Sequence, residues 1–238
     1  MKTRLNLSRL SSLVAIAFGL ASVSTLSALT ITPTGTTFGS LPAATFGGTG
    51  IPNDAVQITT IGDLTLGLTA TQRYANPAPT NDGAGTFFAN SGGDTLDGAP
   101  TYGQWNFNYY VNGLGLFQTV RLYYDNDAAV GNNVANYFES PLNGQDSWNL
   151  GMGFLNGGIF NPNNNGEYGF ALVAYQYEWV MSPNGPTNSL AVPVWTAREI
   201  DRSAILVNVG SVPDAGGTVL MLGAALIGLA LLRRRYVK

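Results

Sequence analysis

The sequence predicts an all-β fold, an antiparallel β-sandwich of jelly-roll type, for the part of the chain between its two ends. Apolar and polar residues alternate over short segments, turn residues separate these segments, and helix signals are nearly absent. The chain has 238 residues, which is enough for one sizeable hydrophobic core. We therefore expect one domain over 29–210, flanked by two terminal segments, 1–28 and 211–238.

The clearest strand begins at Trp105, where large apolar residues alternate with polar ones up to residue 111. This spacing places Trp105, Phe107, Tyr109 and Val111 on one face. Asn-Gly follows at 112–113, and a second apolar segment runs over 114–124. Asn-Gly favours a type I′ turn, in which φ is positive twice. The pattern therefore predicts a hairpin of strands 103–111 and 114–124.

A second long β pattern covers 168–180, as one strand or a bent pair. Phe170, Leu172 and Ala174 are predicted to face one way, and the residues between them the other. Because Pro193 has no backbone N–H, 190–196 is expected to be an edge strand. A long loop is expected over 76–100. Further short strands are expected at 56–61, 64–70, 150–155 and 204–209.

The N-terminal segment has the composition of a secretory signal. Lys2, Arg4 and Arg9 give it a positive start, an apolar stretch covers 10–20, and small residues fill 24–28. This order predicts a signal peptide over 1–28, removed by signal peptidase. The alternatives are an N-terminal membrane anchor and a core helix, although the apolar run is short for a membrane span.

The C-terminal segment combines a short motif, an apolar stretch and a basic end. Val-Pro-Asp-Ala-Gly occupies 212–216, the stretch 217–232 carries no charge, and Arg233, Arg234 and Arg235 follow. A helix over 217–232 would be about 24 Å long, against roughly 30 Å for the hydrocarbon core. The arginines would stop translocation and stay in the cytoplasm. Since the signal peptide also starts on that side, 29–210 is expected outside the inner membrane.

This arrangement resembles the PEP-CTERM sorting domains. Val212, Pro213, Asp214, Ala215 and Gly216 are similar to the VPDSG variant, with Ala215 where that variant has Ser. The resemblance implies that an exosortase, a membrane-embedded Cys transpeptidase-like enzyme, recognises the motif. It would cut near it and deliver the body from the inner membrane to the cell surface or extracellular matrix. The resemblance is limited to 212–238, and the alternative is a tail anchor that is never cut.

Charge and composition exclude several functions. Four of the 11 basic residues and all 14 acidic residues lie between residues 10 and 232, so this part has a net charge of −10. Such a body is unsuited to nucleic acid or to anionic membrane surfaces. The chain has no Cys and no His. Disulfides, thiolate or histidine metal sites and Ser-His-Asp catalysis are therefore excluded.

Aromatic residues offer one candidate binding site. Trp105, Trp148, Trp179 and Trp195 are predicted either to form a platform for extracellular polysaccharide or to lie in the core of a sandwich. Asp125 and Asp127 offer oxygen ligands for Ca²⁺, but the segment does not match an EF-hand, and a solvated turn is the simpler interpretation.

Carboxylates offer the remaining candidate chemistry. Glu139, Glu167, Glu178 and Glu199 would suit a glycan-active hydrolase only if two of them lie at the separation that glycosidases need. We therefore expect an exported, non-enzymatic surface or matrix protein without a cofactor. Its expected partners are signal peptidase, an exosortase and, transiently, the inner membrane. A polysaccharide-binding module is the first alternative, and a secreted hydrolase is the second.

Overall fold

The computed structural model describes residues 29–96, 98–129, 133–134, 136–137, 141–181 and 193–210. The expected signal peptide, the C-terminal motif, the apolar segment 217–232 and Glu139 lie outside the described residues. The regular secondary structure of the described part is almost entirely β, which confirms the predicted class. Its one helix is the short α1 (Gly153–Asn156). Among the described residues, no helix has the length and apolar character needed to cross a membrane.

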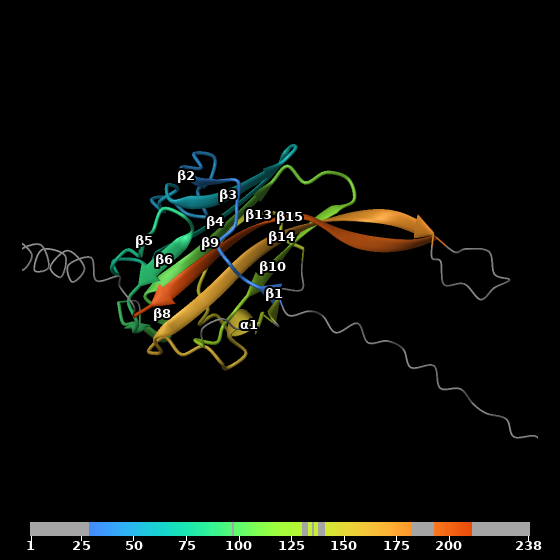
Figure 1. Cartoon of the computed structure of the whole chain (residues 1–238). Helices are drawn as coiled ribbons and strands as arrows, with labels where there is room; N and C mark the ends of the chain where they lie inside the picture. Colours follow the sequence, from blue (N-terminus) through green and yellow to red (C-terminus); the bar gives the residue numbers. More distant parts are fainter. Residues whose placement is uncertain are drawn as a thin grey trace, which may run out of the picture.

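Two larger sheets contain most of the described strands (Figure 1). The six-stranded sheet has the order β12 (Asn136–Tyr137), β10 (Gln118–Tyr124), β14 (Gly166–Met181), β15 (Pro193–Val209), β6 (Thr86–Ala89), β5 (Thr80–Asn81). The five-stranded sheet has the order β13 (Gly144–Trp148), β9 (Trp105–Asn112), β4 (Leu64–Gln72), β3 (Val56–Ile61), β2 (Thr37–Gly39). Two separate two-stranded sheets complete the fold: β1 (Leu29–Thr30) with β11 (Asn133–Val134), and β7 (Gly93–Asp94) with β8 (Ala99–Gly103).

One apolar core joins the two larger sheets. Phe107 on β9 stacks on Phe170 on β14, with ring centroids 4.3 Å apart and planes at 24°. Trp105 and Tyr168 meet across the same interface, with centroids 5.8 Å apart. Both phenylalanines are fully buried. Because large apolar side chains from both sheets fill this space, burying them supplies the main stabilisation of the body.

The predicted side-chain alternation is confirmed on both long strands. Trp105, Phe107, Tyr109 and Val111 all belong to the main core. On β14, Phe170, Leu172 and Ala174 face the main core, whereas Ala171 and Val173 belong to a separate cluster with Ile31 and Ala204 on the other face. A bulge between Ala174 and Tyr175 interrupts the register, but the strand continues as one element.

The predicted hairpin over 103–124 is wrong, because β9 and β10 lie in different sheets. Gly113 has φ of 85°, whereas Asn112 is not among the described residues with positive φ, so a type I′ turn is not formed. A Cβ at Gly113 would lie 2.0 Å from the carbonyl oxygen of Asp63. Glycine therefore allows the chain to pass closely over the neighbouring turn while it crosses from one sheet to the other.

The tight hairpin of the five-stranded sheet lies instead between β3 and β4. Ile61 pairs with Leu64, so the turn has two residues, Gly62 and Asp63. Gly62 has φ of 59°, the sign that a type II′ turn requires at its first central position.

Two other expectations are corrected. Residues 76–100, expected to be a loop, contain β5, β6 and β7 and the start of β8. β6 pairs with β15 in parallel, so the larger sheet is mixed rather than purely antiparallel. A parallel neighbour needs a long connection, which no local pattern in the sequence reveals. The strand expected at 150–155 is instead a turn followed by α1.

β14 and β15 extend beyond the body as a two-stranded arm (Figure 1). β10 pairs with β14 only as far as Gln118 opposite Gln176, and from there β14 continues with β15 as far as Met181 opposite Pro193. Of the expected edge strand 190–196, the described residues 193–196 belong to β15 and pair with β14 on one side, in agreement with the expected edge position.

We predict that Phe170→Ala destabilises the body by about 3–5 kcal/mol, because it removes a buried ring and leaves a cavity between the sheets. Urea unfolding followed by tryptophan fluorescence measures this change. Leu116→Ala is the control, since Leu116 is 86% exposed and should change stability by less than about 0.5 kcal/mol. Equal effects of the two substitutions would contradict the proposed role of the core.

Candidate functional site

The four predicted tryptophans do not form one platform. Trp105 is 4% exposed and packs in the core, so its face cannot stack on a ligand. Trp148 is partly buried against Phe107 and Tyr109. Trp179 is 59% exposed on the β14–β15 arm, and Trp195 lies opposite it in register, with its side chain outside the described residues. Strand alternation assigns Trp105 to the core, whereas Trp179 lies beyond the body.

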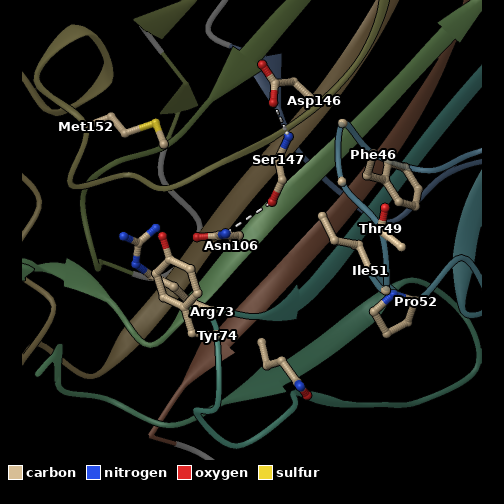
Figure 2. Close-up of a pocket in the computed structure, with 14 residues that line it drawn as sticks. Phe46, Thr49, Ile51, Pro52, Arg73, Tyr74, Asn106, Asp146, Ser147 and Met152 are labelled. Atoms are coloured by element: carbon tan, nitrogen blue, oxygen red, sulfur yellow. Dashed lines mark hydrogen bonds between the residues drawn. The ribbon is translucent and has the colours of Figure 1, made fainter. Parts of the chain in front are cut away.

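A different site, a cleft of about 520 Å³, lies on the five-stranded sheet (Figure 2). Gly47 to Pro52 form one wall. Arg73 and Tyr74, just after β4, face this wall, and Asn106 on β9 and Ser147 on β13 lie between. None of these residues belongs to a recognisable sequence motif, and they come together only when the sheet forms. Phe46, Gln72, Asp146 and Met152 complete the lining.

The loop that forms one wall is fixed to the edge strand β13. Gln145 Oε1 accepts hydrogen bonds from the backbone N–H groups of Thr45 and Phe46, both at 2.7 Å, and its Nε2 donates to Thr45 Oγ1 at 3.1 Å. Phe46 is fully buried in a small cluster with Ala44, Val56 and Tyr110. One polar clamp and one apolar anchor therefore hold the wall in position.

The opposite wall is held by a buried ion pair. Arg73 Nε lies 2.7 Å from Asp94 Oδ2, and the side chains of Arg73 and Asp94 are 9% and 0% exposed. The guanidinium carbon lies 4.7 Å from the ring centroids of both Tyr74 and Tyr102. Asn76 Nδ2 donates to Asp94 Oδ1 at 3.1 Å. The arginine is thus fixed between two rings, and Tyr74 is held against it although it is 63% exposed.

The polar groups of the cleft are also oriented. Buried Asn149 donates through Nδ2 to Asn106 Oδ1 at 2.9 Å, and Asn106 Nδ2 donates to Ser147 Oγ at 3.1 Å. Asp146 Oδ1 accepts the backbone N–H of Ser147 at 2.7 Å (Figure 2). Burial, and then the charge of Asp146, raise the pKa of Tyr109 to about 12, so this phenol stays neutral beneath the site.

The proposed calcium residues follow β10. Asp125 is 8% exposed, and its Oδ1 accepts the backbone N–H of Asp127 at 2.9 Å. Asp127 Oδ1 in turn accepts the backbone N–H of Ala129 at 3.1 Å. These bonds are those of Asx turns, and the first of the two carboxylates, Asp125, is buried rather than solvated. No cluster of three or more metal-binding side chains occurs within the described part of the chain.

Of the glutamates considered for a hydrolase, the three that the structure describes, Glu167, Glu178 and Glu199, do not line the cleft. Glu178 pairs with Arg198 at 3.0 Å and Glu199 with Arg202. Both pairs are on the paired strands β14 and β15. Asp146 is the one carboxylate among the described residues that line the cleft.

We predict that Asp94→Ala destabilises the body by about 3–5 kcal/mol, because it leaves the Arg73 guanidinium buried without its carboxylate. Glu178→Ala is the matched control. It removes an ion pair whose side chains are 64% and 44% exposed, and should cost less than about 1 kcal/mol. Urea midpoints measure both changes, and an Asp94→Ala midpoint as close to wild type as the control would refute the structural role of the buried pair.

Asp125 generates a prediction about pH. Burial, and then the charges of Asp127 and Glu167, raise its pKa above the ordinary 3.8, despite the hydrogen bond from Asp127. The folded state therefore holds this proton more tightly than the unfolded state, and stability falls as pH rises from about 3.8 through the raised pKa. Asp125→Asn keeps the accepting oxygen and removes the charge. It should melt at a higher temperature than wild type at pH 7, and the gap should close near pH 3.

Asp82→Asn is the control, because the carboxylate of Asp82 should affect the pH dependence of stability in the opposite direction. Burial pushes the pKa of Asp82 upward, but hydrogen bonds from Ala84 and Thr86 outweigh this effect and lower it. Its carboxylate thus stabilises the fold above about pH 3.8, and this contribution is lost as pH falls through the lowered pKa. Asp125→Asn melting below wild type at pH 7 would show that the Asp125 charge has a stabilising partner.

The comparison with known families identifies the C-terminal segment. A model of the VPDSG-CTERM motif matches residues 211–236, the segment predicted from Val212 to Gly216 and the terminal arginines. No curated protein and no solved structure matches the chain. The chain therefore carries a VPDSG-CTERM motif, limited to this segment, and the motif indicates a substrate of an exosortase-type sorting system.

Proposed function

We propose that this protein is a non-enzymatic component of the cell surface or extracellular matrix, consisting of a β-sandwich body that an exosortase delivers there. The observation that carries the proposal is the VPDSG-CTERM match at 211–236. In this proposal, signal peptidase removes 1–28, the apolar segment 217–232 holds an intermediate in the inner membrane, and cleavage near Asp214 releases the body.

The charge distribution supports this topology. Lys2, Arg4 and Arg9 precede one apolar segment, and Arg233 to Arg235 follow the other. Both basic groups would stay in the cytoplasm, which leaves the acidic body on the outer side of the membrane. Pro213 just ahead of the apolar segment and Asp214 near its start also suit the beginning of a helix. The motif is thus compatible with both recognition and membrane insertion.

A structural or binding role is supported better than catalysis. The chain has no His, and the described lining of the cleft contributes one carboxylate, Asp146. Glycoside hydrolysis ordinarily uses two carboxyl groups across the scissile bond. Glu178 on the arm pairs with Arg198 on the neighbouring strand, and Glu199 pairs with Arg202 within β15, as expected for ion pairs on a protein surface.

The sorting motif generates a direct prediction. In the native host, Asp214→Ala should accumulate as a full-length or membrane-held form, because the exosortase would no longer recognise the motif. Asp54→Ala is the control, since Asp54 is an exposed carboxylate of the body and should leave processing unchanged. Intact-mass measurement of the surface fraction should show wild-type protein without its first 28 residues and without the segment from the motif onward.

Two results would oppose the proposal. Mature wild-type protein that keeps residues 233–238 would indicate an uncut tail anchor. Normal processing of Asp214→Ala would show that the motif is not what the sorting enzyme recognises. Replacement of Arg233 to Arg235 with glutamine tests the membrane step separately, and should mislocalise the protein while the Val212–Gly216 motif remains intact.

A further inference from the structure

We propose that the cleft between Gly47–Pro52 and Tyr74 binds a segment of a neutral polysaccharide. This binding function goes beyond surface delivery and does not depend on the C-terminal motif. The cleft volume of about 520 Å³ lies within the ~300–1,000 Å³ typical of ligand sites. A second hollow of about 540 Å³, lined by Ala44, Thr45 and Asn53, lies against the same loop, Gly47–Ile51.

Tyr74 supplies the apolar surface that a sugar ring needs. The Arg73 guanidinium covers one face of the Tyr74 ring, with its carbon 4.7 Å from the ring centroid. Tyr74 nevertheless remains 63% exposed, so the other face of its ring is accessible. A pyranose ring has flat patches of C–H groups with hydroxyl groups around its rim. It therefore stacks on an aromatic face while its hydroxyls bond to polar groups beside the ring.

Those polar groups are present and oriented. Asn106 donates one amide hydrogen to Ser147 Oγ. Its second N–H and the hydroxyl hydrogen of Ser147 can therefore bond to a ligand. Asp146 Oδ1 accepts the backbone N–H of Ser147, so its Oδ2 can accept a hydrogen bond from a sugar hydroxyl. Gln72 adds an exposed amide. Donors and acceptors thus alternate over a short distance, as a chain of hydroxyl groups requires.

The charge of the cleft selects for a neutral ligand. Arg73 is already paired with Asp94 at 2.7 Å, so Asp146 is the exposed charge of the site. The surrounding body is strongly acidic. The negative potential of Asp146 and of the acidic body would repel an anionic polymer, because the described lining offers it no exposed cation. A neutral polymer avoids this cost and uses Asp146 as a hydrogen-bond acceptor.

The cleft is preorganised and open at its rim. Phe46 and Tyr74 have φ of 45° and 50°, unusual for bulky residues, and both border the site. Gln145 and Asp94 hold the two walls on which these residues lie. Thr49, Gly50 and Tyr74 at the rim are exposed, so a polymer can lie across the cleft without burying its ends. Fixed walls reduce the ordering cost of binding a flexible chain.

The test uses the full chain, purified in an amine-oxide detergent because sugar detergents would compete. Isothermal titration with cellohexaose, laminarihexaose, mannohexaose and xylohexaose up to about 10 mM should give saturable binding for at least one of them. Tyr74→Ala should weaken that binding by about tenfold or more, whereas Tyr74→Phe should retain it within about threefold, because stacking needs only the ring.

Two further variants keep the result interpretable. Thr49→Arg places a long side chain at the rim from an exposed loop position; it should abolish binding without changing the melting temperature. Leu116→Ala, 86% exposed and outside the cleft, should bind as wild type does. Saturation of none of the four oligosaccharides, equal affinity in Tyr74→Ala and wild type, or preference for tetragalacturonate over all four would overturn the proposal.

Discussion

The packing of one sheet on the other is the constraint on which the rest of the body depends. The chain contains no Cys, so no disulfide can hold an exported domain together. The stack of Phe107 on Phe170 fixes β9 against β14, and Trp105 extends this contact to Tyr168. The same packing determines which side chains lie on the face of β9 away from the core. With Trp105 and Phe107 in the core, Asn106 between them must point away, and it becomes part of the cleft.

The cleft also depends on polar contacts that the core does not supply. Its walls come from loop segments next to β3 and β4, and each is fixed by one buried or half-buried polar side chain. Gln145 holds the 45–46 backbone, and Asp94 holds Arg73. A surface site built in this way is rigid because the scaffold beneath it is rigid, and the exposed ring of Tyr74 is displayed at little entropic cost.

Local patterns in the sequence predicted what depends on local chemistry. The alternation along 105–111 and 170–174 identified the core faces, because the pleat of a strand fixes them without reference to partners. The VPDSG-CTERM motif was likewise predictable from contiguous residues and is matched by the family model.

Which strands pair with one another was not predictable from local patterns. Asn112-Gly113 has the composition of a hairpin turn, but Gly113 instead allows close passage over Asp63, so the chain changes sheets. The cleft was not predictable for the same reason, since Phe46, Tyr74, Asn106 and Ser147 meet only through long-range pairing. Trp105, predicted as part of a binding platform, is instead buried in the core.

In the function proposed above, the two terminal segments direct delivery of the protein, and the body supplies a β surface with one preorganised cleft. The measurement that tests this division most directly is antibody labelling of intact native cells, with one antibody raised against 29–210 and another against 233–238. The account predicts that the body antibody labels unpermeabilised cells and that the tail antibody does not label the same surface material. Body labelling that needs permeabilised cells, together with recovery of the full-length chain in the cytosolic fraction, would contradict it.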